Sequence, residues 1–451
     1  MTLNEIQTRL RALEVRPSKG LGQNFLHDQN LARWFVDRLE AQPGDLLVEI
    51  GPGLGSLTEV IEKTGVRALA IERDSRLAAF LAERYAGGSV EIRHEDATRF
   101  DVRELWGKGR VKVIGNLPYS VSTPLIDRFT SALSPACLLV LGLQKELADR
   151  LGAGPGTSDY GAMTVRLQRR WNIRVVKRLP ASVFLPRPNV ESAIVEMRPR
   201  LRGEFPPCDA ELFGELVRRG FSERRKQFHK LLGPYRSAWP AAAERLGVPE
   251  TTRAEALSVA QWIDLTNLLG PLPTAQKDEE IFPWVDEEDR VIGERPRREV
   301  HVNNLRHRAV HMLIFNTSGE LFLQKRSPWK DMSPSLWDSS AAGHVDAGEE
   351  YDAAAVREIR EELGVDVNLE PLFKLPSIPA TAWEFIQVYR GVHDGPFQLA
   401  PAEIETGAFF PVARVLEWAA ASPEDFTPVC RLVLDWLRAQ PIPVHGVSSP
   451  S

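Results

Sequence analysis

Cysteine and long apolar runs are what this 451-residue sequence has least of. Its three cysteines, Cys137, Cys208 and Cys430, are scattered and never in CxxC spacing, which argues against a disulfide framework or a structural zinc. No apolar run reaches the roughly 18 residues that a membrane helix needs. The opening stretch, MTLNEIQTRLRALEV, lacks the apolar block of a signal peptide. We therefore expect a cytoplasmic protein.

The net charge of −5 is unevenly distributed along the chain. Residues 1–270 contain 39 Lys and Arg against 32 Asp and Glu, whereas the remaining residues contain 17 against 29. Within residues 161–230 the basic excess rises to +9, from 16 basic and 7 acidic residues. This asymmetry predicts that residues 1–270 bind a polyanion and that the residues after 270 have a separate role.

Short β-branched runs alternate with amphipathic helical patterns from Leu46 onward, which favours a mostly parallel sheet with helices on both faces. From about residue 205 to 268 the pattern is helical only. Residues 270–280, GPLPTAQKDEE, combine turn residues with charge and are typical of a linker. We therefore predict five segments: an α/β domain (1–204), a helical annex (205–269), a linker (270–280), a second α/β domain (281–440) and a disordered tail (441–451).

A glycine-rich turn follows the first strand of this pattern. In VEIGPGLGSLTEVI, Gly51, Gly53 and Gly55 lie between a strand and a helix, where the backbone approaches a ligand closely. Glu72 ends the next strand, at the place of a carboxylate that binds a ribose diol. Ser56 stands where a dinucleotide fingerprint has its third glycine, so S-adenosylmethionine, a nucleoside without phosphates, fits better. A tight turn without a ligand is an equally open alternative for the glycines alone.

Polar residues also follow the third and fourth strands. Asp96 is placed to hold an adenine amino group, although an N-cap explains it as well. After VKVIG come Asn116, Leu117, Pro118 and Tyr119, which we expect beside the ligand at the carboxyl ends of the strands. The Asn116 side-chain oxygen and the Leu117 or Pro118 carbonyl are suited to accept both N–H bonds of a purine amine, with Pro118 fixing the backbone and Tyr119 stacking on the base. The alternative is an ordinary Asx-Pro turn.

Residues 1–270 resemble the small-subunit ribosomal RNA adenine dimethyltransferases. The resemblance rests on these stretches: GLGQNFLHD, VEIGPGLGSLT, IERD, EDAT, GNLPYSVSTPL, YGAMTV, FLPRPNVESAIV and FSERRKQFHKLL. It implies a Rossmann-like methyltransferase sheet with a small helical annex. It also implies dimethylation of two adjacent adenosines in a hairpin near the 3′ end of small-subunit (16S) rRNA. Large-subunit rRNA methyltransferases share the core motifs, but the last two stretches look more like the small-subunit branch.

The same resemblance assigns roles to individual residues. It implies that Asn116 and Tyr119 serve the target adenine, and we expect Pro118 between them to be catalytically important because it fixes the backbone. The residues that it places against S-adenosylmethionine are Asn24, Leu26, Gly51, Gly53, Glu72, Asp96 and Asn116. A basic helix bearing Arg224, Arg225, Lys226 and Lys230 is expected to contact RNA phosphates, because the surrounding basic excess favours this role over a merely solvated face.

Residues Gly343 to Val365, GHVDAGEEYDAAAVREIREELGV, match the Nudix box G-x5-E-x7-R-E-U-x-E-E-x-G-U at every fixed position. Glu358, Glu361 and Glu362 are three and four residues apart and share one helical face, where their repulsion is unfavourable without a cation. Their hard oxygens suit Mg²⁺ or Mn²⁺, which would clamp a diphosphate and activate water, with Glu361 as a catalytic residue. A surface helix rich in salt bridges is the alternative. The resemblance implies an α/β/α Nudix sandwich.

The flanks of the box resemble the Nudix branch closest to isopentenyl-diphosphate isomerase. Counterparts of that isomerase's metal ligands are then His301, His307 and His344, with Glu403 and Glu405. The isomerase needs a cysteine just before the Gly-His pair, and Ala342 stands there instead. The resemblance therefore favours hydrolysis of a diphosphate-linked compound over isomerisation.

The sequence thus predicts two enzymes fused in one chain. One alternative is an RNA-binding assembly factor of the small subunit with a nucleotide-sensing Nudix module. Another is a large-subunit rRNA adenine methyltransferase. The Nudix substrate, the oligomeric state and the reason for the fusion stay open.

Overall fold

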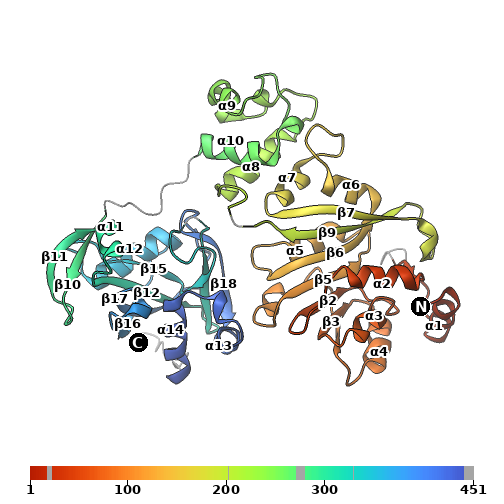
Figure 1. Cartoon of the computed structure of the whole chain (residues 1–451), viewed down its shortest axis with the longest axis horizontal. Helices are drawn as coiled ribbons and strands as arrows, with labels where there is room; N and C mark the ends of the chain where they lie inside the picture. Colours follow the sequence, from red (N-terminus) through yellow and green to blue (C-terminus); the bar gives the residue numbers. More distant parts are fainter. Residues whose placement is uncertain (18–22, 202, 271–279, 329, 441–451) are drawn as a thin grey trace, which may run out of the picture. The chain divides into compact units, whose positions relative to one another are not determined.

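The computed structural model describes residues 1–17, 23–201, 203–270, 280–328 and 330–440. The chain divides into two compact units, Met1–Pro271 and Leu272–Ser451 (Figure 1). Most of the predicted linker and the whole predicted tail lie outside the described residues. The finer boundary at residue 204 stays a prediction. No helix in the described ranges is long and apolar enough to cross a membrane.

The first unit is built on a seven-stranded sheet in the order β4-β3-β2-β5-β6-β9-β7. Its strands are β2 (Leu46–Ile50), β3 (Ala68–Glu72), β4 (Val90–His94), β5 (Val111–Asn116), β6 (Ala136–Gln144), β7 (Trp171–Leu179) and β9 (Ser192–Pro199). The first five strands of that order pair in parallel, and β9 and β7 continue the sheet antiparallel. The strand order reverses between β2 and β5, because β3 and β4 are added on one side of β2 and β5 and β6 on the other. Open α/β sheets bind ligands at such a switch point.

Alternate residues of these strands pack under helices on opposite faces, as a period of two requires. Val48 and Val113 lie in a core with α5 (Ser122–Phe129), α6 (Lys145–Gly152) and α7 (Ala162–Gln168). Leu47 and Ile114 lie in the other core with α2 (Gln29–Asp37), α3 (Thr58–Lys63) and α4 (Ser75–Arg84). The α/β class predicted from the strand runs is confirmed. Outside this sheet, α1 (Leu3–Ala12) packs near the short pair β1 (Phe25–Leu26) and β8 (Phe184–Leu185).

The helical annex consists of α8 (Ala210–Gly220), α9 (Trp239–Arg245) and α10 (Val259–Leu269), joined by short 3₁₀ turns. Its core contains Phe228, Trp239 and Trp262, whose rings meet edge to face at 5.0 Å around Phe228. The predicted basic helix is wrong. Residues 221–227 form turns, and residues 228–230 form a 3₁₀ turn, because burial of Phe228 pulls this segment out of helical register.

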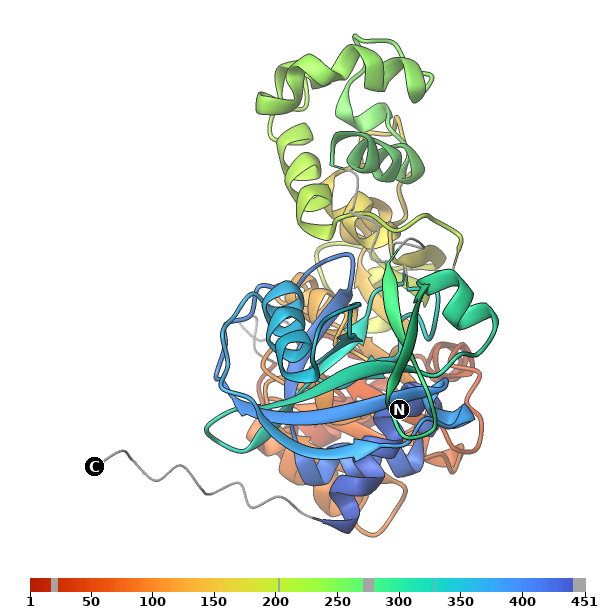
Figure 2. The ribbon, with the colours of Figure 1, turned by 90° about the vertical axis from the view of Figure 1, so that its left-hand side faces the viewer.

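The second unit contains a seven-stranded mixed sheet. Its main order is β14-β13-β12-β17-β16, with β15 beside β12 and β18 beside β13. The strands are β12 (His307–Phe315), β13 (Glu320–Arg326), β14 (Trp337–Asp338), β15 (Ala341–His344), β16 (Glu370–Leu375), β17 (Glu384–Val392) and β18 (Ile404–Pro411). Helix α12 (Tyr351–Leu363) covers one face, and α13 (Val412–Ala421) and α14 (Pro428–Ala439) lie on the other (Figure 2). The predicted α/β/α sandwich is confirmed.

A small hairpin precedes this sheet. It pairs β10 (Ile281–Val285) with β11 (Val291–Pro296) in antiparallel fashion and leads into the short helix α11 (Arg297–Val302). The hairpin and α11 place Phe282, Arg297 and His301 at the same pocket as the Nudix box.

Candidate active sites

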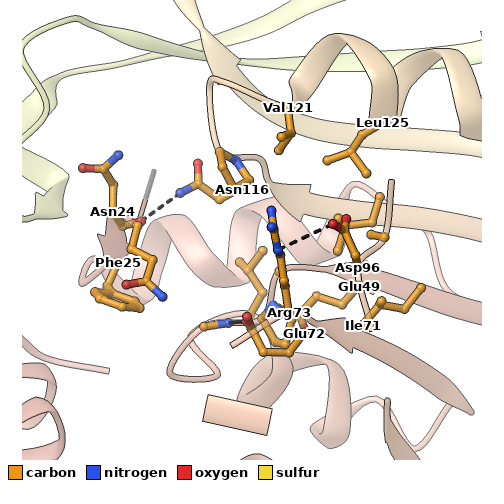
Figure 3. Close-up of a pocket in the computed structure, with 18 of the residues that line it drawn as sticks. Asn24, Phe25, Glu49, Ile71, Glu72, Arg73, Asp96, Asn116, Val121 and Leu125 are labelled. Atoms are coloured by element: carbon orange, nitrogen blue, oxygen red, sulfur yellow. Dashed lines mark hydrogen bonds and ion pairs between the residues drawn. The ribbon is translucent and has the colours of Figure 1, made fainter. Parts of the chain in front are cut away.

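A pocket opens at the carboxyl ends of β2, β3 and β5, next to the end of β4 (Figure 3). The residues predicted to bind the cofactor all line it, and Pro118 lines it too; they are Asn24, Leu26, Gly51, Gly53, Glu72, Asp96 and Asn116. Among the described residues that line this pocket, Tyr119 is absent. The pocket thus gathers side chains from segments spread over about a hundred residues of sequence.

The glycine turn is bonded to Glu72. Gly51 and Gly53 have φ angles of +65° and +61°, in the left-handed region that favours glycine. The Gly53 N–H donates to one Glu72 carboxylate oxygen at 2.9 Å, and the Asp74 N–H donates to the other at 2.8 Å. Burial raises the pKa of Glu72, while these two donors lower it. Each oxygen keeps acceptor capacity, so the carboxylate can also receive a ribose diol.

Asp96 belongs to a local turn and faces the pocket as well. Its Oδ1 accepts from the Thr98 N–H at 3.0 Å and from the Thr98 hydroxyl at 2.7 Å. Its Oδ2 lies 3.5 Å from Nε of Arg73, whose side chain lies across the pocket in Figure 3. The residues after Asp96 form turns rather than a helix, so the alternative role as a helix N-cap is not what the structure shows.

The charge of this pocket indicates the kind of ligand it fits. Among the described lining residues, the carboxylates are Glu49, Glu72, Glu95 and Asp96, and Arg73 is the one cation. Glu49 is buried and accepts from the Thr58 hydroxyl at 2.7 Å, and burial raises its pKa to about 8. A phosphate would be repelled here, because the carboxylates of Glu72, Glu95 and Asp96 outnumber the one guanidinium even with Glu49 protonated. A cationic sulfonium nucleoside fits the donor and acceptor set.

Asn116 ends β5 with its amide in a fixed orientation. Its Nδ2 donates to the Asn24 carbonyl at 3.0 Å, which leaves Oδ1 as an acceptor (Figure 3). Gly142 on the neighbouring strand provides the space, because a Cβ there would lie 2.7 Å from Asn116 Oδ1. The sequence pattern did not reveal Gly142, since nothing in the spacing shows which residue of β6 lies beside Asn116.

The residues after Asn116 are also held in place by hydrogen bonds. The Pro118 carbonyl already accepts from the Val121 N–H at 3.1 Å and from the Ser122 hydroxyl at 3.0 Å. This favours the Leu117 carbonyl as the second acceptor of a target amine. The Tyr119 hydroxyl lies 2.7 Å from the Ser192 hydroxyl, and burial raises the pKa of Tyr119, so its phenol stays neutral.

The four predicted RNA-binding residues differ in their contacts. Arg224 donates to the Ser158 and Tyr160 carbonyls at 2.6 and 3.0 Å and lies 3.6 Å from Glu255. Lys226 pairs with Glu223 at 2.8 Å. Arg225 and Lys230 are exposed and have no recorded partner in the described ranges.

In the second unit the three box glutamates lie on α12 and line one pocket. The Glu358 side chain is 12% exposed and pairs with Arg357 at 2.6 Å, whereas Glu361 is 59% exposed and lies 3.4 Å from the same Arg357. Glu362 is buried and accepts from the Ala342 N–H at 3.1 Å. Burial and mutual repulsion raise the pKa of Glu358, and burial raises that of Glu362. The donor set fits a divalent cation, which would relieve this repulsion.

Three other features of the box have a visible structural reason. A Cβ on Gly343 would lie 2.0 Å from the Glu358 carboxyl carbon, so only glycine leaves room for that side chain. Gly364 ends α12 with a φ of +68°, the left-handed cap that favours glycine. Arg357 also pairs with Glu349 at 2.9 Å, so the box arginine ties two of the box glutamates together.

Basic side chains line the same pocket as these carboxylates. They are Arg297, Arg326, Lys330, Arg357 and Arg431. Lys330 is 11% exposed and pairs with Glu403, and burial lowers its pKa. Such cations fit the phosphates of a diphosphate-linked compound.

The histidines named from the flanks come together, but with a different glutamate from the predicted ones. His301, His307 and His344 each offer a ring nitrogen, and these atoms lie within 4.8 Å of one another. Glu384 on β17 joins them. Glu403 pairs with Lys330 and Glu405 lies 3.4 Å from Lys325, so a role of these two carboxylates beside the histidines stays a prediction. Burial lowers the pKa of His301 to about 4 and of His344 to about 3, so both imidazoles are neutral at pH 7.

Comparison with known proteins finds a family for each unit. A family model described as ribosomal RNA adenine dimethylase matches residues 16–270, and one described as NUDIX domain matches residues 305–430. A ribosomal RNA small subunit methyltransferase A of Sphingopyxis alaskensis is 40% identical over 275 residues, which cover 59% of this chain and 98% of the relative. The protein of that name from Alkaliphilus metalliredigens is 37% identical over 263 residues, 56% of this chain and 92% of the relative.

A solved dimethyladenosine transferase from Plasmodium falciparum aligns with 53% of this chain and 95% of its own, at 23% identity and a TM-score of 0.45. The family models define an S-adenosylmethionine-dependent methyltransferase unit followed by a Nudix hydrolase unit. The chain belongs to the ribosomal RNA adenine dimethylase family, whose methyltransferases use S-adenosylmethionine.

Proposed function

We propose that the first unit dimethylates the N6 amines of two adjacent adenosines in a hairpin near the 3′ end of small-subunit (16S) rRNA, during ribosome biogenesis in the cytoplasm. The observation that carries this is Asn116, whose Oδ1 is left as an acceptor beside the acidic nucleoside pocket. The curated relatives at 37–40% identity, named for the small subunit, support that substrate over large-subunit rRNA.

Each residue of the pocket has a defined task in this proposal. Bound S-adenosylmethionine supplies an activated methyl group, so the protein mainly has to position the acceptor. Glu72 would hold the ribose diol, and Asp96 the adenine amino group of the cofactor. Asn116 Oδ1 and the Leu117 carbonyl would accept the two N–H bonds of the target amine and draw its lone pair out of conjugation. Tyr119, fixed by Ser192, would stack on the target base.

Methyl transfer from labelled S-adenosylmethionine to immature small and large subunits, followed by mapping of the product, tests this function. We expect dimethyladenosine at two adjacent positions near the 3′ end of small-subunit rRNA, and a loss of about 10²–10³-fold in Asn116→Ala. Asn172→Ala, an exposed change on β7, is the control. Product on the large subunit would contradict the substrate. RNA binding without transfer would favour an assembly factor instead.

The contacts of the basic residues refine the proposal for RNA binding. Arg225 and Lys230 are exposed and would contact RNA phosphates directly. Arg224 is bonded to the Ser158 and Tyr160 carbonyls and would mainly hold this turn in place.

For the second unit we propose Mg²⁺- or Mn²⁺-dependent hydrolysis of a diphosphate-linked compound. Support comes from carboxylates and cations that line one pocket: Glu358, Glu361 and Glu362 would hold the metal, and Lys330 and Arg326 would bind phosphate. The bound metal would activate a water, with exposed Glu361 beside it as a base. Ala342 in the position of the isomerase cysteine agrees with hydrolysis.

A screen of diphosphate-linked compounds for release of phosphate with Mg²⁺ or Mn²⁺ tests this hydrolysis. We expect turnover that falls about 100-fold or more in Glu361→Gln, the scale of losing a catalytic group. Glu417→Gln, an exposed change on α13, is the control. Binding of a nucleotide without hydrolysis would instead favour a sensory module.

A further inference from the structure

Glu362, the last glutamate of the Nudix box, is held at both ends by other segments of the unit. Its backbone carbonyl accepts from the Ala400 N–H at 3.0 Å, and its side-chain Oε2 accepts from the Ala342 N–H at 3.1 Å. A third donor is the Gln324 side chain, whose Nε2 lies 3.1 Å from the same Oε2. Strands β13 and β15 therefore both direct an N–H group at one carboxylate oxygen of α12.

These two donors leave the other carboxylate oxygen for a ligand. Both hydrogen bonds end on Oε2, whereas Oε1 has no recorded partner among the described residues. Glu362 lines the pocket together with Glu358 and Glu361. Two N–H groups on one oxygen fix the plane of the carboxylate. They therefore also fix the direction in which Oε1 can meet a cation.

Gln324 is a buried glutamine with an unsatisfied amide oxygen. It is 1% exposed, and its Oε1 has no hydrogen-bond partner in the part of the chain that the structure describes. Buried acceptors are nearly always satisfied, so this orientation of the amide is unfavourable by itself. The opposite orientation would place the amide oxygen against the Glu362 carboxylate and would lose the hydrogen bond. The bond to Glu362 therefore decides how the Gln324 amide is oriented.

Packing alone does not account for a glutamine at this position. Gln324 and Phe322 are two residues apart on β13 and share a face of the sheet, and Phe322 packs in the core beneath α12. An apolar side chain of the same length, such as methionine, would fill the space beside Phe322 without burying an unsatisfied oxygen. What the glutamine adds is the N–H group on Glu362.

From these contacts we propose that Gln324 is a positioning residue for the divalent cation of the Nudix box. Glu358, Glu361 and Glu362 would coordinate the cation, and Gln324 would act only through Glu362, by holding Oε2 so that Oε1 is left for the cation. Hydrogen bonds to metal ligands orient them, and their loss typically weakens metal binding 10–100-fold. This inference rests on the proposed metal site of the box glutamates but not on hydrolysis.

Binding of Mn²⁺ to the full chain, measured from the EPR signal of free Mn²⁺, tests the role of Gln324. The Mn²⁺ that Glu362→Gln fails to bind defines the box site and separates it from other Mn²⁺ on the chain. Gln324→Met keeps the length of the side chain but removes the amide, so we expect the affinity of the box site to fall about 10–100-fold. Gln324→Asn, one carbon too short for the bond, should weaken it likewise. Gln398→Met, an exposed change outside the pocket, should bind as wild type.

Stability and metal activation distinguish this role from a structural one. Thermal unfolding of the metal-free chain should change little in Gln324→Met, because the unsatisfied oxygen is removed together with the N–H group. Hydrolysis of a compound found in the screen should need about 10–100-fold more Mn²⁺, with a rate at saturating Mn²⁺ within a few fold of wild type.

Wild-type affinity of the box site in the folded Gln324→Met and Gln324→Asn chains would overturn the inference. So would the absence of any Mn²⁺ binding that depends on Glu362 in the wild-type chain. Weakened Mn²⁺ binding in both variants without hydrolysis of any compound would support the role of Gln324 and count only against the proposed hydrolase.

Discussion

The two pockets hold their carboxylates in different ways. In the first unit, Glu72, Asp96 and Glu49 are bonded to backbone N–H groups and hydroxyls, and one guanidinium faces them. In the second unit, carboxylates are paired with cations, as in Arg357 with Glu358 and Lys330 with Glu403. A cationic nucleoside that binds Asp96 therefore meets one internal ion pair in the first pocket, that of Asp96 with Arg73. Divalent cations and phosphates have to rearrange the ion pairs of the second.

This comparison predicts two kinds of sensitivity. Methyl transfer in the first pocket depends on the shape of the pocket and on the direction of its neutral hydrogen-bond acceptors. Small steric changes should therefore abolish methyl transfer. The second depends on charge, so removal of a charge should lower its activity while relieving repulsion in the metal-free protein.

A large effect is expected from Gly142→Ala, at the lower end of the range expected for Asn116→Ala. Its Cβ would lie 2.7 Å from Asn116 Oδ1, in a strand backbone that alanine adopts without strain. We expect methyl transfer to fall about 100-fold, within the range of a misplaced catalytic group. Binding of S-adenosylmethionine should change by no more than a few fold. Single-turnover transfer and equilibrium binding measure the two, with Gly214→Ala on α8, where a Cβ meets nothing within 4 Å, as the control. Equal transfer in both variants would contradict the steric role.

A charge change in the second pocket should separate activity from stability. Glu362→Gln keeps the size of the side chain and an acceptor for the Ala342 N–H, but removes a buried charge beside Glu358. We expect hydrolysis to fall about 100-fold, while the metal-free chain becomes more stable by about 1 kcal/mol. Phosphate release and urea unfolding without metal check both. A variant that is less stable without metal would show that the charge stabilises the pocket rather than strains it.

The buried carboxyl of Glu49 predicts a pH dependence for the first unit. The pKa of the Glu49 carboxyl is about 8 in the folded chain, against an ordinary value of 4.5. As the pH rises, the unfolded chain therefore releases this proton at a lower pH than the folded chain does. The stability that the protonated carboxyl contributes is complete below pH 4.5 and is lost as the pH rises toward 8. Between pH 6 and 8 we expect a loss of about 2 kcal/mol, at about 1.4 kcal/mol per pH unit.

Glu49→Gln should remove this pH dependence. Hydrogen exchange of residues 46–50 in the full chain at pH 6 and 8, corrected for intrinsic rates, reports the stability of β2. Glu83→Gln, an exposed change on α4, should behave as wild type. The same loss of protection in Glu49→Gln and wild type would exclude Glu49 as its source.

The smallest expected effects concern RNA. Arg225→Ser and Lys230→Ser should each reduce the salt dependence of log K for RNA by about 0.7–1, the value of one phosphate contact. Arg224→Ser should leave that slope unchanged and destabilise the annex by about 1 kcal/mol, because it loses hydrogen bonds to two carbonyls. Binding at several salt concentrations and thermal unfolding distinguish the roles. A reduced slope in Arg224→Ser would place that residue on the RNA as well.

Much of the fold could be predicted because strand runs such as VKVIGN begin with mainly apolar, β-branched residues. The glycine turn, Asn116 and the box glutamates could be found because each motif is local in sequence. The basic helix was predicted wrongly because burial of Phe228 overrides the local pattern. Gly142 and Glu384 could not be found, since their roles depend on which strands pair and in which register.

The most direct test of the account compares cofactor binding with methyl transfer in one preparation of Asn116→Ala. Because Asn116 Oδ1 is proposed to accept the target amine, labelled S-adenosylmethionine should bind within about tenfold of wild type. Transfer to immature small subunits at saturating cofactor should fall about 10²–10³-fold. Transfer that is restored at saturating cofactor would contradict this account and would make Asn116 a cofactor-binding residue only.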